Sequence, residues 1–197
     1  MKNSIKVLAA LVVMLTPGIV LKAQNVKAAS GVYLTENDYK NNKLSYVINS
    51  PDKLQLNDFL GGKNIKLTYQ GKKVKLPKSG IYGVSINNQA FRFYHNDTYK
   101  ILDTAGFMLY SKQTLTQGTK GYIPAEHYFY SRDLGQPVLD LTVANLWNSF
   151  PKDTKFRYSL QNYFHSDSDL IAFDQSENEY KLKYLYFDSK KVLAAHR

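Results

Sequence analysis

Lysine side chains crowd one short segment of the chain, with six of them between residues 63 and 78. In this segment apolar and polar residues alternate on both sides of Gln70-Gly71, a pattern typical of a β-hairpin with a two-residue turn. Lys66, Lys73 and Lys75 fall on the strand face opposite the apolar residues. Ammonium groups gathered on one face attract anionic polymers and lipid headgroups, whereas lysines on an exposed strand also protect a sheet edge. We therefore treat these three residues as the candidate binding face, with a solvated sheet face as the alternative.

His165, Asp167 and Asp169 form the one short cluster whose side chains could bind a metal ion. The cluster has no second histidine at metal-binding spacing, and its acidic positions do not continue into the glycine and glutamate of a calcium loop. The same residues are also typical of a helix end followed by a polar turn that caps the next element. We expect that turn, and we expect neither a bound metal nor another cofactor.

Catalytic signatures are missing from the chain. Cysteine is absent, the segment from Gly83 to Asn87 lacks the final glycine of a G-x-S-x-G nucleophile turn, and no phosphate-binding or dinucleotide-binding glycine pattern occurs. A pair of carboxylates that meets only in the folded chain would leave no local signature. The scattered candidates for such a pair are Glu36, Asp38, Asp103, Glu126 and Asp174. A cofactor-free hydrolase of envelope or dietary polymers therefore stays open as the alternative to a binding protein.

Composition narrows the class of protein further. The 197 residues include 26 Lys and Arg against 16 Asp and Glu, for a formal charge of +10, and 44% of them are hydrophobic. This hydrophobic fraction is too high for a disordered chain. Because cysteine is absent, neither a disulfide framework nor lipidation of a cysteine is available, so stability must come from an ordinary core. Nucleic acid is the usual partner of so basic a chain, but export makes that partner unlikely here.

The first 23 residues read as a cleaved signal peptide. Lys2 and Lys6 precede an apolar run over residues 7–15, which Pro17-Gly18 interrupts. Ala23 then ends a small-residue cleavage site, with a second site after Ala28. The apolar run is about half of the roughly 20 residues that a membrane-spanning helix needs. We expect residues 24–197 to form a single exported domain, periplasmic or extracellular, that does not span the membrane after cleavage.

Strands fill the first part of the predicted domain and helices the last part. Alternating apolar residues predict strands separated by turn residues, over residues 31–34, 44–48, 54–56, 65–69, 74–76, 82–86, 91–93, 99–101, 107–110 and 128–131. Thr35 is expected to cap a short helix, and Thr142 and Asp153 to cap two more. Residues 170–187 fit either a strand or a helix, and the β-propensity of their tyrosines favours a strand. The fold class predicted is α+β: an antiparallel β-meander, as a half-barrel or sandwich-like sheet, followed by two short helices and a final strand or helix.

Four stretches, at residues 31–46 (GVYLTENDYKNNKLSY), 64–67 (NIKL), 99–102 (YKIL) and 120–123 (KGYI), resemble a group of exported proteins of Bacteroidota. The resemblance covers most of the chain after residue 23, and it implies export and a cell-envelope setting. It implies no activity, cofactor or catalytic residue. Asp103-Thr104-Ala105 is similar to the short sequon for O-glycosylation of exported proteins in that phylum, which makes Thr104 a candidate modification site. An ordinary turn explains the same three residues.

Together these observations predict a cell-envelope protein that binds rather than catalyses. Its partner would be an anionic glycan, an anionic lipid surface or an envelope protein. The absence of a catalytic signature favours this interpretation over the hydrolase, because a β-rich scaffold is well indicated by the sequence and a reaction is not.

Overall fold

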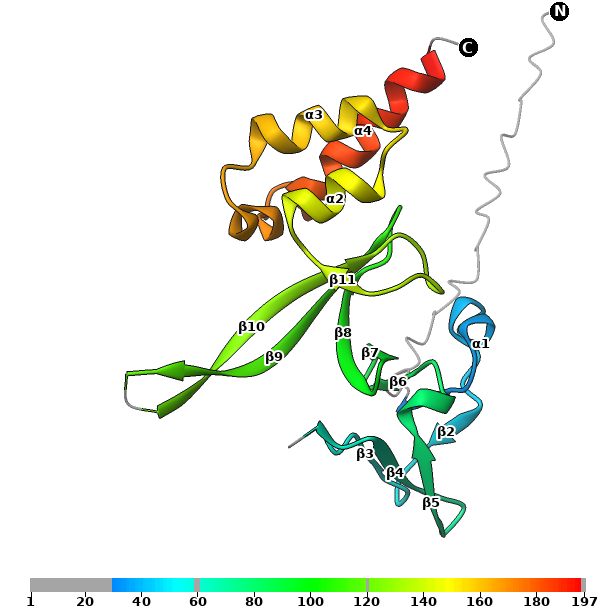
Figure 1. Ribbon diagram of the computed structural model, residues 1–197. Coiled ribbons are helices and arrows are strands. Elements are labelled where there is room, and N and C mark those ends of the chain that lie inside the picture. The colour runs from blue at the N-terminus through cyan, green and yellow to red at the C-terminus, as the bar shows by residue number, and fades with distance from the viewer. Residues whose placement is uncertain (1–29, 59–60, 120, 196–197) are drawn as a thin grey trace, which may run out of the picture.

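The computed structural model describes residues 30–58, 61–119 and 121–195, with side chains described as far as residue 191. The predicted signal peptide, residues 1–23, lies outside this part of the chain. Figure 1 shows three regions: a central antiparallel sheet, a small sheet at one end and a group of helices at the other. The predicted α+β class is therefore confirmed.

The central sheet has eight strands in the order β11-β10-β9-β8-β7-β6-β1-β2. Its strands β6 to β11 follow one another along the chain and form the expected meander, while β1 and β2 add to the β6 edge. The strands are β1 (Ser30–Tyr33), β2 (Tyr46–Ile48), β6 (Gly83–Ile86), β7 (Gln89–Tyr94), β8 (Asp97–Asp103), β9 (Met108–Gly118), β10 (Gly121–Ser131) and β11 (Leu139–Asp140).

Local sequence explains the tight connections of this sheet. Asn87-Asn88 joins β6 to β7, and His95-Asn96 joins β7 to β8, with both residues of each pair at positive φ. Two successive positive φ values give the turn whose twist matches that of paired strands, and asparagine tolerates this conformation better than most residues do. Thr35 caps α1 (Glu36–Lys40) in a reciprocal capping box with Asp38, as predicted.

The small sheet consists of β3 (Leu54–Gln55), β4 (Asn64–Tyr69) and β5 (Lys72–Pro77), followed by the short helix η2 (Lys78–Gly80). Its apolar side chains pack on one face of the central sheet and form a core with the buried Val32, Val84 and Phe93. Because side chains alternate along a strand, the opposite face of the small sheet points to solvent.

Helices cover another part of the central sheet. They are α2 (Val143–Ser149), α3 (Thr154–Tyr163) and α4 (Lys181–Ala195), with η3 (Asp167–Ile171) and the hairpin β12 (Phe173–Asp174) and β13 (Glu179–Tyr180) between α3 and α4. Leu146, Phe156 and Leu160 are fully buried against Leu109 and Tyr130 of the sheet. This cluster is the larger core of the protein, and the helices enclose it (Figure 1).

The preference for a strand over residues 170–187 is wrong for most of the segment. Most of the tyrosine-rich part belongs to α4, in which Leu182 and Leu185 are both buried in the helical core. Two leucines three positions apart lie on one helical face, whereas a strand would place them on opposite faces. Burial against the helices therefore outweighs the β-propensity of the neighbouring tyrosines.

The β9–β10 hairpin is much longer than the sequence predicted. Its two strands pair from Met108 and Ser131 out to Gly118 and Gly121, and the outer part projects from the sheet as an arm (Figure 1). Leu115 and Tyr122 on the arm are 62% and 71% exposed. The outer arm has no core to bury, so the alternation that marks a half-buried strand is weak in its sequence. Within the described residues, no helix has the length and apolar character needed to span a membrane.

Candidate functional site

The predicted lysine hairpin is present, and its register places the three candidate lysines together. Lys66 pairs directly with Lys75 across β4 and β5, and Lys73 pairs with Thr68 one step along the same face. The three lysines are exposed, whereas Leu67 on the opposite face is buried. Gln70 and Gly71, both at positive φ, form the turn that fixes this register.

A fourth lysine, Lys53, joins this face from the position just before β3. The backbone oxygen of Lys53 accepts a hydrogen bond from the Thr68 N–H at 2.8 Å, and Gln55 pairs with Lys66. Since Leu54 between them packs toward the core, Lys53 and Gln55 point to the solvent side. We call Lys53, Lys66, Lys73 and Lys75 the lysine face. The sequence did not point to Lys53, because β3 is only two residues long and its pairing with β4 is a tertiary contact.

The lysine face carries charge that no ion pair within the described residues neutralises. Among the described residues, none of its four ammonium groups is in an ion pair. Like charges directly opposite each other on paired strands are destabilising, and Lys66 and Lys75 are so placed. The arrangement favours an external anion, because an anion would relieve this repulsion.

Lys78, in the same stretch of sequence, has a different role. Its side chain is only 1% exposed, and Nζ lies 2.6 Å from the carboxylate of Asp58 and 5.5 Å from the ring centre of Phe93. Thr98 on β8 also donates to Asp58, at 2.5 Å. Lys78 therefore ties the β3–β4 loop to the central sheet and is not available to a ligand.

Two of the three candidate metal ligands, Asp167 and Asp169, cap helices. The Asp167 carboxylate accepts a hydrogen bond from the Val143 N–H at 2.8 Å, and Asp169 accepts from the N–H groups of His165 and Ser166 at 3.0 and 2.9 Å. Hydrogen bonds from Ser166 and His165 also lower the pKa of Asp169. The expected polar turn at a helix end is therefore present. The described part of the chain contains no group of three or more side chains placed to hold a metal ion.

Thr104 lies in an exposed turn between β8 and β9. The Asp103 carboxylate accepts a hydrogen bond from the Ala105 N–H at 2.6 Å, and Gly106 follows at φ +72°. This is the turn that the sequence indicated for the segment. The Thr104 side chain is exposed, so a modifying enzyme could reach it.

The carboxyl groups with a shifted pKa do not resemble a general acid. Each described carboxyl group whose pKa is shifted has it lowered: Asp38, Asp169, Asp174 and Asp188. In each, the largest cause is a hydrogen bond from a neighbouring side chain, which favours the ionised form. A general acid needs its pKa raised toward the working pH, so these four groups are suited to capping and ion pairing.

Two buried cations were missed by the sequence analysis. Arg92 on β7 is 4% exposed and donates to the Tyr110 hydroxyl at 2.8 Å, the Ser131 hydroxyl at 3.1 Å and the backbone oxygen of Gln136 at 2.8 Å. The rings of Tyr82 and Tyr94 also flank the guanidinium. No local signal separates this arginine from an exposed one, because its partners lie up to 44 residues away in the chain.

Lys183 on α4 is the second buried cation. Its ammonium group donates to the backbone oxygens of Ala105 and Phe107, lies 3.4 Å from the Asp103 carboxylate and stacks on the Phe107 ring. Burial lowers the pKa of Lys183 to about 8, against the opposing effect of Asp103. This lysine joins α4 to the β8–β9 turn, and its complete burial excludes a ligand.

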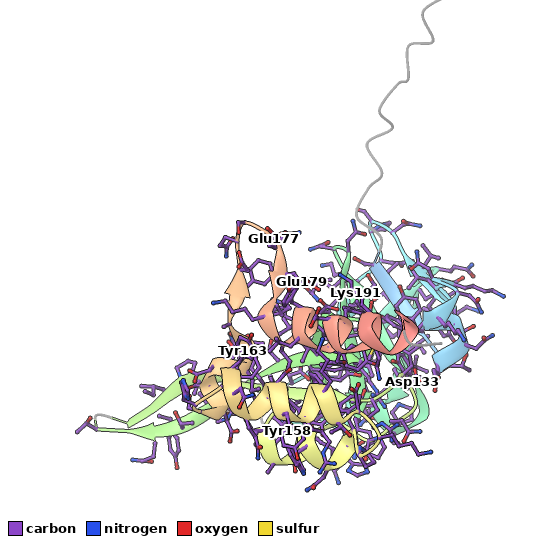
Figure 2. All side chains as sticks on the ribbon, turned by 90° about the horizontal axis from the view of Figure 1, so that it is seen from above. Asp133, Tyr158, Tyr163, Glu177, Glu179 and Lys191 are labelled. Carbon is purple, nitrogen blue, oxygen red and sulfur yellow. The ribbon has the colours of Figure 1, made fainter. Side chains whose placement is uncertain are left out.

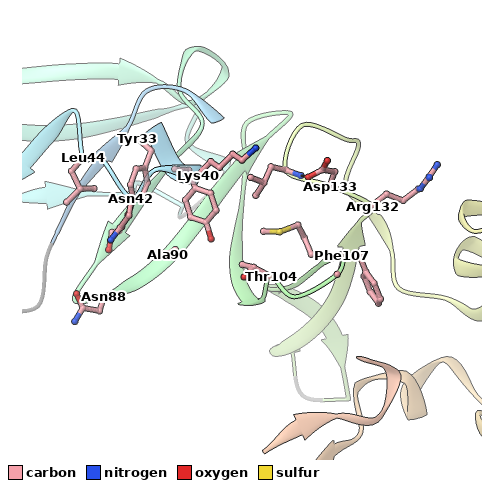
Figure 3. A pocket seen from close by; sticks show the side chains of 15 residues that line it. Tyr33, Lys40, Asn42, Leu44, Asn88, Ala90, Thr104, Phe107, Arg132 and Asp133 are labelled. Carbon is pink, nitrogen blue, oxygen red and sulfur yellow. Dashed lines mark hydrogen bonds between the residues drawn. The ribbon is translucent and has the colours of Figure 1, made fainter. Parts of the chain in front are cut away.

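Grooves are present on both the sheet and the helical region. One of about 720 Å³ lies between α1 with the adjoining sheet face and the segments around Thr104 and Asp133 (Figure 3). Another, of about 520 Å³, lies where Tyr163 at the end of α3 meets the β12–β13 hairpin; Figure 2 shows Glu177 and Glu179 on that hairpin. The lysine face lies outside both grooves.

Comparisons with protein-family models, with curated proteins and with solved structures find no match to this chain.

Proposed function

We propose that this chain is an exported, non-enzymatic binding protein of the cell envelope, and that it binds an anionic glycan through the lysine face. The observation that carries the proposal is the direct pairing of Lys66 with Lys75 on an exposed sheet face, beside Lys53 and Lys73, with no ion pair to any of them in the described chain. Export rests on the pattern of residues 1–23.

A glycan fits this surface better than the two other partners considered. The solvent face of the small sheet presents lysine, glutamine and threonine side chains, without the exposed large apolar groups that anchor a protein in a bilayer interface. The ammonium groups lie on β4, on β5 and next to the start of β3, so they can contact successive charges of an extended chain. Protein interfaces, by contrast, are poor in lysine at their centres.

The test compares three lysine-to-glutamine substitutions on the face with three elsewhere. The binding variant carries Lys66→Gln, Lys73→Gln and Lys75→Gln, and the control carries Lys43→Gln, Lys152→Gln and Lys191→Gln, which are also exposed. The protein is recovered from its host envelope, and its mass gives the N-terminus, expected at Gln24. Binding is measured to heparin, as a polyanionic polysaccharide, and to dextran, as a neutral one.

We expect heparin binding that weakens as salt screens the charges, about a tenfold loss for the binding variant, or roughly 1.4 kcal/mol, and little loss for the control. Equal losses in both variants would show that heparin binding depends only on the net charge of the protein, which would contradict the proposal. Vesicles of phosphatidylglycerol serve as the lipid probe. Binding to those vesicles without binding to heparin would make a lipid surface the partner instead.

A further inference from the structure

The groove between α1, the central sheet and the segments around Thr104 and Asp133 has the composition of a ligand site. Its volume of about 720 Å³ is in the range of sites for small molecules. Ala90 and Met108 contribute to its apolar lining, together with Leu134. The small sheet packs against the opposite face of the central sheet, since Val84 in its core alternates with Ser85 in this groove.

Polar groups face this apolar surface from both walls. On one wall, Lys40 is exposed and without an ion pair in the described chain, and Asn42 accepts a hydrogen bond from the Tyr33 hydroxyl through Oδ1 at 3.1 Å, which leaves its amide N–H groups as donors. On the other wall, Asp133 accepts from the Leu134 N–H through Oδ1, which leaves Oδ2 as an acceptor. Figure 3 shows the Lys40 side chain extending toward the segment that carries Asp133.

A buried positive charge lies behind the groove. The Tyr39 ring, which lines the groove, stacks on Tyr82 with ring centres 5.1 Å apart, and the Arg92 guanidinium lies 5.6 Å from the centre of Tyr82. No carboxylate of the described chain is in an ion pair with Arg92. Its charge, which low-dielectric surroundings screen poorly, adds to that of Lys40. These two positive charges exceed the single negative charge of Asp133 on the other wall, so the groove attracts an anion.

We propose that this groove binds one sugar ring that carries a carboxylate. Sugar hydroxyls both donate and accept hydrogen bonds, and the groove offers both functions: the Asn42 amide donates and Asp133 accepts. The C–H face of the ring lies on the apolar lining, and Lys40 binds the carboxylate. The site is separate from the lysine face and does not depend on the function proposed for it.

Titration calorimetry with glucuronate, glucose and acetate tests the proposal on the full-length protein. We expect glucuronate to bind about fivefold more tightly than glucose, as for one ion pair near the surface, and acetate to bind more weakly than either sugar. Lys40→Gln should bring glucuronate to the level of glucose, and Asp133→Asn should weaken both sugars to a similar extent. Lys43→Gln, a nearby exposed lysine outside the groove, should leave all affinities unchanged.

Two results would overturn this assignment. Acetate binding as tightly as glucuronate would show a bare anion site, and glucuronate binding that is unaffected by both Lys40→Gln and Asp133→Asn would place the sugar elsewhere. The variant with glutamine at positions 66, 73 and 75 should still bind glucuronate normally. A loss of glucuronate binding in that variant would mean that the sugar occupies the lysine face, which separates failure of this proposal from failure of the glycan-binding one.

Discussion

The small sheet and the central sheet use positive charge in opposite ways. On the small sheet, Lys66 and Lys75 lie side by side in solvent, and no ion pair to either occurs in the described chain. On the central sheet, Arg92 is buried and donates to three neutral oxygen atoms, those of Tyr110, Ser131 and Gln136. The side chains have the same sign of charge, so their surroundings decide what each can do.

The buried cations hold loops in place. Arg92 connects β7 to the end of β10 through Ser131 and to the segment after β10 through Gln136. Lys183 connects α4 to the β8–β9 turn through Ala105 and Phe107. Removing a buried hydrogen-bonding partner leaves the other group unsatisfied, which costs more than the bond itself contributed. We therefore expect the buried cations to govern stability and the lysine face to govern binding.

The largest effect is expected at Arg92. Substitution Arg92→Met removes three hydrogen bonds to a charged group and should lower the free energy of unfolding by at least about 3 kcal/mol. Arg92→Lys keeps the charge but cannot reach all three acceptors, so it should recover only part of the loss. Urea unfolding at constant m-value measures both variants. A loss below about 1 kcal/mol would mean that Arg92 contributes no more to stability than an exposed lysine does, and it would contradict this prediction.

Lys183 should make stability depend on pH. Its pKa is about 8 in the folded protein, against about 10.4 in an unfolded chain. Between these two pKa values the unfolded chain binds more protons than the folded protein, so the free energy of unfolding rises with pH. This gain is lost as the pH falls through 8. From pH 7.5 to 9.5 this contribution is on the order of 2 kcal/mol. Unfolding of Lys183→Met over that range should show a smaller rise than the wild type, and equal slopes would contradict the assignment.

The smallest effect on stability is expected at the lysine face. Lys66→Gln relieves the repulsion with Lys75 and should raise the free energy of unfolding by roughly 0.2–0.5 kcal/mol. The gain should shrink at high salt, because salt screens exposed charges. Lys43→Gln, on an exposed loop away from this pair, is the control in the same thermal unfolding series. A clear loss of stability in Lys66→Gln would mean that the face is a structural element rather than a binding surface.

The parts of the fold that the sequence predicted correctly depend on short-range rules. Turn pairs such as Asn87-Asn88 and Gln70-Gly71, and the capping residues Thr35, Thr142 and Asp153, act through neighbours within a few positions. The incorrect preference for a strand over residues 170–187 arose where local propensity opposed packing. There, burial of Leu182 and Leu185 against distant residues decided the outcome.

The residues of the candidate site show the same difference between short-range rules and tertiary contacts. Alternation in the sequence was enough to place Lys66, Lys73 and Lys75 on one exposed face, because a strand has a period of two whatever surrounds it. Alternation could not show that Lys53 lies on the same face, that Lys78 is buried or that the two walls of the groove lie opposite each other. These features depend on contacts between separate elements. The sequence by itself thus determined the hairpins, the caps and the sides of the strands. The tertiary structure alone decided which charges are compensated, because Lys183 reaches the backbone oxygen of Ala105 across 78 positions of the chain.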